Sequence, residues 1–170
     1  MRLKVLNELP DQSLAKAAAE KISQVYGVET SMVNARIDNF EQYYDKKRRQ
    51  YNVVALLSHI KPEENYLLLM TDRDIFVPGL NFVFGYAPGR VAVVSVYRLD
   101  PLRTEDRVDD QLLRRRVVKE AVHEVGHMLG LRHCSTPGCV MNFSNSVWDV
   151  DLKGETPCEK CMKKVISSQG

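Results

Sequence analysis

Residues 123–133 read HEVGHMLGLRH, and this stretch, which fits the pattern HExxHxxGxxH, decides both the architecture and the chemistry that we expect. On a helix, positions four apart lie one turn above the other, so His123 and His127 present two imidazoles on one face. Zinc accepts two histidines at this spacing, and Glu124 lies where its carboxylate can reach a zinc-bound water. The stretch therefore predicts a helix that carries a zinc site.

Gly130 and His133 complete the pattern. A glycine can adopt the left-handed backbone conformation that ends a helix, so we expect the chain to turn sharply at Gly130. That turn would bring His133 back to the metal as a third ligand. Three nitrogen ligands leave a fourth position for water, which is typical of a catalytic zinc site rather than a structural one.

The residues around the histidines predict an amphipathic helix from about Val108 to Leu129. At 100° per residue, one face of this helix carries Val118, Ala121, Val122, Val125, Met128 and Leu129. The two histidines fall on the opposite side, near Arg116 and Glu120. We therefore expect the helix to bury one side in a core and to offer its histidines to a cleft with the other.

Size and charge narrow the range of functions. At 170 residues, the chain is expected to form one domain with a real core. Lysine and arginine number 24 against 22 aspartates and glutamates, a net charge of +2 that favours no nucleic-acid partner. Residues 1–6 alternate like a strand and lack the apolar core of a signal peptide, and no apolar run is long enough to span a membrane. We expect a cytoplasmic protein that binds no membrane and is a monomer.

All four cysteines lie in the last third of the chain, at Cys134, Cys139, Cys158 and Cys161. The spacing C-x4-C followed by C-x-x-C is typical of paired metal-ligand turns, and cytosolic thiols are not normally held as disulfides. We expect a second, structural zinc bound by four thiolates. A redox pair formed by Cys158 and Cys161, and two disulfides, remain open as alternatives.

The order of elements predicts an α/β fold. Strands are expected near residues 2–8, 28–36, 66–70, 81–87 and 91–97. Helices are expected at residues 11–27, from the charged residues 45–49 through Leu57, at 108–129 and at 158–167. Strands that alternate with helices imply a mixed, mostly parallel sheet with covering helices. Trp148 falls in a segment expected to be irregular, which it would anchor to the core.

The zinc pattern, together with the four cysteines and Met141, resembles that of the archaemetzincins, a branch of the metzincin zinc peptidases. The specific match runs from His123 to Cys161. The resemblance implies a metzincin-like zincin with a twisted mixed sheet in an N-terminal catalytic subdomain, residues 1–133. It also implies a small zinc-stabilised C-terminal subdomain, residues 134–170, and an active-site cleft between the two.

The same resemblance implies roles for single residues. Met141 would form the methionine turn beneath the metal, where a thioether suits an apolar floor. Archaemetzincin positions are also matched by Ser144, Asp151 and Lys153. Pro157 departs from the pattern, because an aromatic residue is expected before the last cysteine pair. Phe143 is not the tyrosine that some metzincins use as an extra ligand, so no further protein ligand is expected.

The predicted function is that of a zinc metallopeptidase with two zinc ions per chain. Glu124 would act as general base on the zinc-activated water, and a peptide or protein would be the substrate. The best candidate for the strand that aligns the substrate is residues 81–87, with Phe84, Gly85 and Tyr86 near the cleft. Two alternatives stay open: a zinc amidohydrolase acting on a non-peptide amide, and a catalytically latent, zinc-stabilised binding protein.

Overall fold

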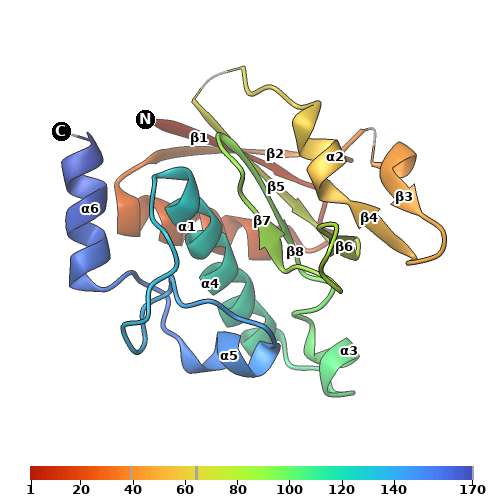
Figure 1. Ribbon diagram of the computed structural model, residues 1–170. Helices are drawn as coiled ribbons and strands as arrows, with labels where there is room; N and C mark the ends of the chain where they lie inside the picture. Colours follow the sequence, from red (N-terminus) through yellow and green to blue (C-terminus); the bar gives the residue numbers. More distant parts are fainter. Residues whose placement is uncertain (39, 64, 170) are drawn as a thin grey trace.

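The computed structural model describes residues 1–38, 40–63 and 65–169 (Figure 1). A five-stranded sheet has the order β2-β1-β5-β8-β7 and a smaller sheet the order β3-β4-β6. The strands of the larger sheet are β1 (Arg2–Asn7), β2 (Glu29–Asn34), β5 (Tyr66–Thr71), β7 (Gly85–Tyr86) and β8 (Val91–Ser95). All neighbouring pairs in it are parallel except β7 with β8. The prediction of a mixed, mostly parallel sheet with covering helices is confirmed.

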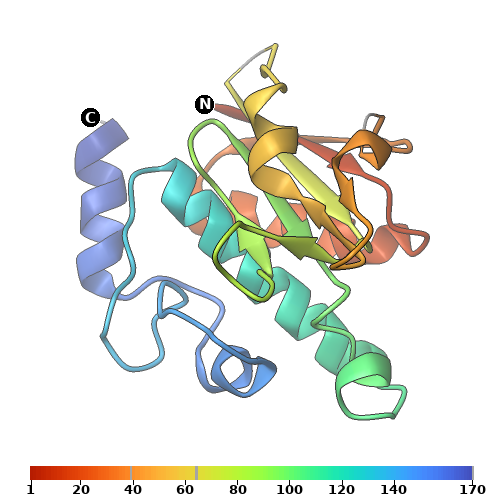
Figure 2. The ribbon, with the colours of Figure 1, turned by 45° about the vertical axis from the view of Figure 1, so that its right-hand side comes forward.

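The other elements complete the fold around this sheet. The smaller sheet consists of β3 (Tyr44–Asp45), β4 (Gln50–Asn52) and β6 (Ile75–Phe76), with a 3-10 turn, η1 (Glu41–Tyr43), before it. The helices are α1 (Gln12–Tyr26), α2 (Val53–Ser58), α3 (Pro101–Thr104), α4 (Asp110–Met128), α5 (Val147–Leu152) and α6 (Glu159–Gln169). The long helix α4 crosses the molecule beside the sheet, and the segment after it leads to α5 and α6 (Figures 1 and 2).

Both faces of the larger sheet are covered. Leu68 and Met70 of β5 belong to the core that α1 and α4 share, whereas Leu69 of the same strand packs with α2 on the opposite face. Successive side chains of a strand point to opposite faces, so a central strand buried on both sides has apolar residues at every position. Strand β8 follows this pattern up to its last residue, because all five of its residues are buried and only Ser95 is polar.

Two capped helices form the layer next to this core. Asp11 caps α1 by accepting from Ser13 N at 3.0 Å, and Gly27, with a φ of +69°, ends it. Asp109 caps α4 in the same way through Leu112 N at 3.0 Å. The two helices pack against each other, and Tyr26 of α1 donates its hydroxyl to a backbone carbonyl of α4, Val122 O, at 2.9 Å.

The expectation that α4 buries only one side is incomplete. From Arg116 to Gly126 all its residues are buried, the charged ones included. Arg116 is fully buried and lies among several acceptors, which include Asp151 Oδ1 and Oδ2 at 2.8 and 2.7 Å, Glu105 Oε1 at 2.6 Å and Leu99 O at 2.9 Å. The hydrogen bonds that Arg116 donates to the Asp151 carboxylate are the largest influence that raises the pKa of this guanidinium. Arg116 therefore ties α5 and the end of α3 to α4.

Three sequence predictions are wrong in detail. Of residues 45–49, Asp45 ends β3 and residues 46–49 form the turn to β4 rather than starting a helix, because Asp45 Oδ1 accepts from Lys47 N and Arg48 N. Within residues 81–87 only Gly85 and Tyr86 form a strand. Trp148 lies on α5 with 71% of its surface exposed, since α5 docks through Val150 and the Asp151 carboxylate instead. The segment is thus held by an ion pair where an aromatic anchor was expected.

Replacing Arg116 by leucine should destabilise the fold by about 2 to 3 kcal/mol, because a buried cation with several charge-assisted hydrogen bonds is lost. Urea denaturation followed by circular dichroism measures this. The matched control is Arg115→Leu, the same change at the exposed neighbouring position, for which we expect a change within about 0.5 kcal/mol. Equal denaturation midpoints for the two variants would contradict the role given to Arg116.

Candidate metal centres and the cleft between them and strand β7

The chain reverses direction directly after α4. Gly130 has a φ of +93°, in the left-handed region that disfavours a side chain. Leu131 N donates to Gly126 O at 2.9 Å and Gly130 N donates to His127 O at 3.0 Å, so the last helical carbonyls are satisfied within the turn. The reversal brings His133 back alongside the helix.

Three imidazoles meet after this reversal. One ring nitrogen from each of His123, His127 and His133 lies within 4.8 Å of the others. The Nε2 atoms of His123 and His127 are 3.1 Å apart. Two nitrogens bound to a tetrahedral zinc at about 2.1 Å lie about 3.4 Å apart, so the group is close to the spacing that this metal requires. The predicted ligands are therefore brought together, and they could hold a metal ion.

The surroundings favour the neutral imidazoles that metals bind. His123 Nδ1 is 2.8 Å from Val140 O and His127 Nδ1 is 2.8 Å from Leu131 O. A carbonyl only accepts, so each Nδ1 carries the proton and each Nε2 keeps a lone pair for a metal. Burial lowers the pKa of both rings and of His133, and the ammonium of Lys153 lowers the pKa of His123 further.

Glu124 is a buried carboxyl group in the same cleft, with 5% of its surface exposed. Burial raises its pKa well above the usual value, and the charge of Glu120 acts in the same direction. Its position depends on Gly85 in β7. A Cβ at position 85 would lie 2.7 Å from Glu124 Oε1 and 2.8 Å from Val93 O, so only glycine leaves room for this carboxylate.

Met141 packs against α4 at Gly126, which lies in the sequence between His123 and His127. It is fully buried, and a Cβ at position 126 of α4 would lie 2.5 Å from its sulfur and 2.8 Å from the Tyr26 hydroxyl. Gly126 therefore allows the methionine turn to approach the helix between the two histidines. Sequence reasoning did not assign a role to Gly126, although its place inside the HExxH stretch, where a glycine weakens a helix, was a signal.

The four cysteines form a second group. Cys134 Sγ is 3.8 Å from Cys158 Sγ, Cys139 Sγ is 3.9 Å from Cys161 Sγ, and all four sulfur atoms lie within 4.8 Å of one another. Two sulfurs bound to a tetrahedral zinc at about 2.3 Å lie about 3.8 Å apart, whereas a disulfide requires about 2.05 Å. The spacing is that of a four-thiolate metal site.

Backbone amides support thiolates in this group. Cys158 N donates to Cys139 Sγ at 3.2 Å and Thr136 N donates to Cys134 Sγ at 3.4 Å. A backbone N–H of Cys161 lowers the pKa of Cys158 to about 6. The hydrogen bond from Thr136 lowers the pKa of Cys134 as well, whereas burial raises those of Cys139 and Cys161. The N–H donors thus stabilise thiolates, the form of cysteine that binds a metal cation.

A cleft of about 670 Å³ connects the histidines to the edge of the sheet. Phe84, Gly85 and Tyr86 line it on one side, as expected from the sequence. The segment after Met141, beginning with Phe143, lines the other side, and the Phe143 ring centroid is 5.2 Å from that of His133. An extended chain could lie between these two walls, across the three histidines and Glu124.

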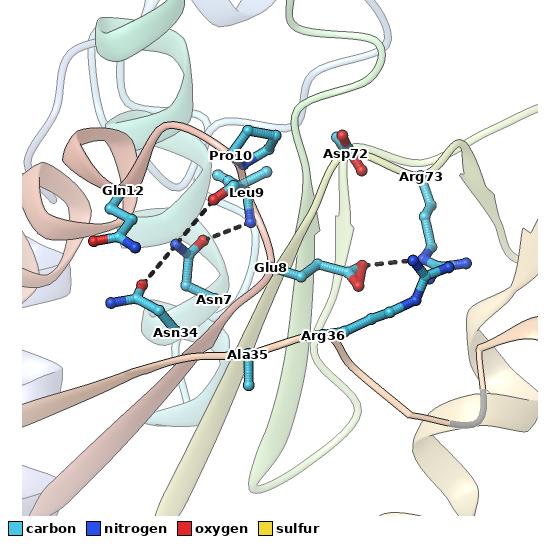
Figure 3. A pocket seen from close by; sticks show the side chains of 10 residues that line it. All are labelled: Asn7, Glu8, Leu9, Pro10, Gln12, Asn34, Ala35, Arg36, Asp72 and Arg73. Atoms are coloured by element: carbon cyan, nitrogen blue, oxygen red, sulfur yellow. Dashed lines mark hydrogen bonds and ion pairs between the residues drawn. The ribbon is translucent and has the colours of Figure 1, made fainter.

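Another crevice, of about 510 Å³, lies where β1, β2 and β5 end, and it shares no lining residue with the cleft (Figure 3). Ligands of doubly wound sheets often bind at such strand ends. Here, however, Glu8 pairs with Arg73 Nε at 3.0 Å, and Asn7 donates to Asn34 Oδ1 at 3.0 Å (Figure 3). These polar groups join the strand ends to one another, which explains their burial without a ligand.

Comparison with known proteins shows the family of this chain. A model of peptidase family M54 matches residues 14–167. The chain belongs to peptidase family M54. Relatives of this family member include the archaemetzincin of Pyrococcus abyssi, which is 43% identical over 148 residues, 82% of this chain and 79% of the relative.

Two crystal structures of archaemetzincins share the fold of this M54 peptidase. That from Methanopyrus kandleri has a TM-score of 0.86 and 39% identity and covers 99% of this chain and 95% of its own. That from Archaeoglobus fulgidus, complexed with malonate, has a TM-score of 0.84 and 39% identity and covers 96% and 99%. The predicted resemblance to archaemetzincins is confirmed, and the M54 chain is a zinc metallopeptidase that acts on peptides. Among the described residues, no helix is long and apolar enough to cross a membrane.

Replacing Gly85 by alanine should lower peptide hydrolysis about 10- to 100-fold, because the added methyl group would displace the Glu124 carboxylate by several tenths of an ångström. Gly89→Ala is the matched control, since a Cβ at position 89 would meet nothing within 4 Å. Rates on one fluorogenic peptide, with melting temperatures measured in parallel, test this. Equal rates for both variants would show that Glu124 does not need the space above Gly85.

Proposed function

We propose that the peptide bond is hydrolysed at a zinc ion bound by His123, His127 and His133, with Glu124 as general base. The main observation behind this proposal is that the neutral imidazoles of the three histidines and the buried carboxyl group of Glu124 lie in a single cleft. Three protein ligands leave a coordination position open, as catalytic zinc sites do. A bound zinc would lower the pKa of a coordinated water and polarise the scissile carbonyl.

Glu124 moves the proton in this reaction. It accepts the proton of the attacking water and returns it to the leaving amine, so it has to exist in both protonation states. Burial raises the pKa of Glu124, and the charge of a bound zinc would act in the opposite direction. The two influences on the pKa of Glu124 therefore oppose each other, as a group that both accepts and returns a proton requires.

Strand β7 aligns the substrate in our proposal. It is at the edge of the larger sheet, and its two residues, Gly85 and Tyr86, line the cleft. An extended peptide can pair with the free backbone groups of an edge strand, which holds the scissile bond over the metal ligands. Phe84 precedes the strand and adds an apolar surface for a substrate side chain.

The four cysteines bind a second zinc, so that the chain holds two ions. This zinc stabilises residues 134–170 as a small subdomain against the catalytic part, residues 1–133. The carbonyl of Val140, between Cys139 and Met141, accepts from the ligand His123, so the thiolate cluster also supports the surroundings of the catalytic zinc. We further propose that the protein acts as a monomer in the cytoplasm. No observation favours a non-peptide amide or a latent binding role over this reading.

Glu124→Ala should keep zinc at the histidines but reduce peptide hydrolysis at least about 100-fold, because the water loses its proton acceptor. Cleavage of a diverse peptide library by the zinc-replete protein, analysed by mass spectrometry, measures the loss. Zinc content by atomic emission is the companion measurement. Undiminished cleavage by the variant would refute the role of Glu124, whereas lost zinc would mean that the residue is needed for the metal.

Cys158→Ser should weaken zinc binding at both centres. The loop between Cys134 and Cys139 is flanked by the ligand His133 and by Val140, whose carbonyl is bonded to His123, so loosening the loop also loosens the histidine site. We expect one zinc per chain fewer, a lower melting temperature and roughly tenfold faster loss of the histidine-bound zinc to a chelator. Ser135→Ala, an exposed change in the same loop, is the control and should behave like the wild type. Unchanged metal content and melting temperature in Cys158→Ser would exclude the four-thiolate site.

A further inference from the structure

The cleft contains two polar groups that the proposed reaction does not use, Glu120 and Ser144. Glu120 lies on α4 one turn before Glu124 and has only 3% of its surface exposed. The Ser144 hydroxyl is buried and has no hydrogen-bond partner among the residues that the structure describes. Buried polar groups are normally hydrogen-bonded, so an unpaired hydroxyl in a substrate cleft indicates that a ligand group completes it.

Lys153 links Glu120 to the segment that carries Ser144. Its Nζ is 2.9 Å from Glu120 Oε1 and donates to Asn142 O at 3.1 Å, two residues before Ser144. The side chains of Lys153 and Glu120 are 1% and 4% exposed, so water competes little with their ion pair. A carboxylate has about four lone-pair sites, and Lys153 occupies one side of Glu120 only. Apart from this ion pair, Glu120 Oε1 has no hydrogen-bond partner among the described residues, so the carboxylate keeps acceptor capacity for a ligand in the cleft that it lines.

The remaining lining combines apolar and aromatic side chains with the neutral amides of Asn81 and Asn145. Phe82, Phe84 and Phe143 line the cleft, and none of its described lining residues is a lysine or an arginine. An acidic side chain of a substrate would therefore meet acceptors and no cationic donor. A purely apolar side chain would bury Glu120 and Ser144 without a partner, which costs free energy.

We propose that Glu120 and Ser144 form a subsite for a substrate side chain with an apolar stem and a hydrogen-bond donor at its tip. The stem packs on the aromatic wall, and the donor bonds to the Glu120 carboxylate and the Ser144 hydroxyl. The four residues from Glu120 to Glu124 rise about 6 Å along the helix, and neighbouring residues of an extended peptide are about 3.3 Å apart. The subsite thus receives a residue within two positions of the scissile bond. This inference rests on the proposed peptidase function.

The test compares three peptides that differ at one position flanking the scissile bond, with glutamine, methionine or glutamate there. These side chains are similar in length, and only glutamine donates a hydrogen bond. We expect kcat/KM of the zinc-loaded wild type to be at least about tenfold higher for glutamine than for the other two. The experiment is run with the variable residue at the first and at the second position on each side of the scissile bond. Equal rates for all three peptides on both sides would overturn the subsite.

Two variants assign the preference to these residues. Ser144→Ala should reduce the advantage of glutamine over methionine several-fold, whereas the control Ser146→Ala, outside the cleft lining, should not. Glu120→Gln should narrow the gap between glutamate and glutamine, because a carboxamide can donate to an acidic side chain. An advantage of glutamine that both variants leave intact would show that other residues cause it.

Measurements of peptide binding test the subsite independently of the proposed peptidase reaction. The affinities of the same three peptides for Glu124→Gln, measured by calorimetry, report side-chain recognition without turnover. If the wild type cleaves none of the peptides, the proposed peptidase function fails, and the order of affinities still decides the subsite. If the wild type cleaves all three and the affinities are equal, the reaction stands and the subsite is refuted.

Discussion

The interior position of α4 imposes the constraint on which the rest of the structure depends: polar side chains on its buried length need partners inside the protein. A buried polar group without a hydrogen bond costs free energy, and a buried charge costs more. On this helix, Arg116 pairs with the Asp151 carboxylate and Glu120 pairs with the Lys153 ammonium. Lys119 donates a hydrogen bond to Val150 O at 3.1 Å. Further along the helix, the Nδ1 atoms of His123 and His127 are hydrogen-bonded to the backbone carbonyls of Val140 and Leu131. The helix therefore presents a series of hydrogen-bond donors and acceptors, and the chain that follows it has to supply their partners.

That match explains how the last part of the chain holds its place with little apolar surface of its own. Helix α5 contributes a carboxylate, two carbonyls and, just beyond it, the ammonium of Lys153. Cys139, Val140 and Met141 join the same core as α1 and α4, so the segment is continuous with the sheet side of the molecule. The contacts that satisfy α4 are also the contacts that position the metal ligands. Stability and active-site geometry consequently cannot be altered separately at these positions.

Local patterns in the sequence predict what depends on local physics. The spacing of His123 and His127, the capping of α1 and the turn at Gly130 each follow from residues a few positions apart. The partners of Arg116 could not be found in this way, because Glu105 and Asp151 are 11 and 35 residues distant and many other carboxylates were available. The exposed position of Trp148 has the same origin, since a non-local ion pair replaced the expected aromatic contact. The hairpin at Asp45 was missed because its side-chain turn competes with helix formation over a strongly charged segment.

The close approach of Met141 to α4 has a consequence for oxidative damage. Conversion of a methionine to its sulfoxide adds an oxygen atom to the sulfur and makes the side chain polar. At Met141 that sulfur is fully buried and faces Gly126 and the Tyr26 hydroxyl, where even a methyl group on the glycine would collide with it. An oxidant therefore reaches this thioether only after the turn has opened. Once modified, the turn cannot close again against the helix, so the injury to the metal centre would outlast the oxidant until the sulfoxide is reduced.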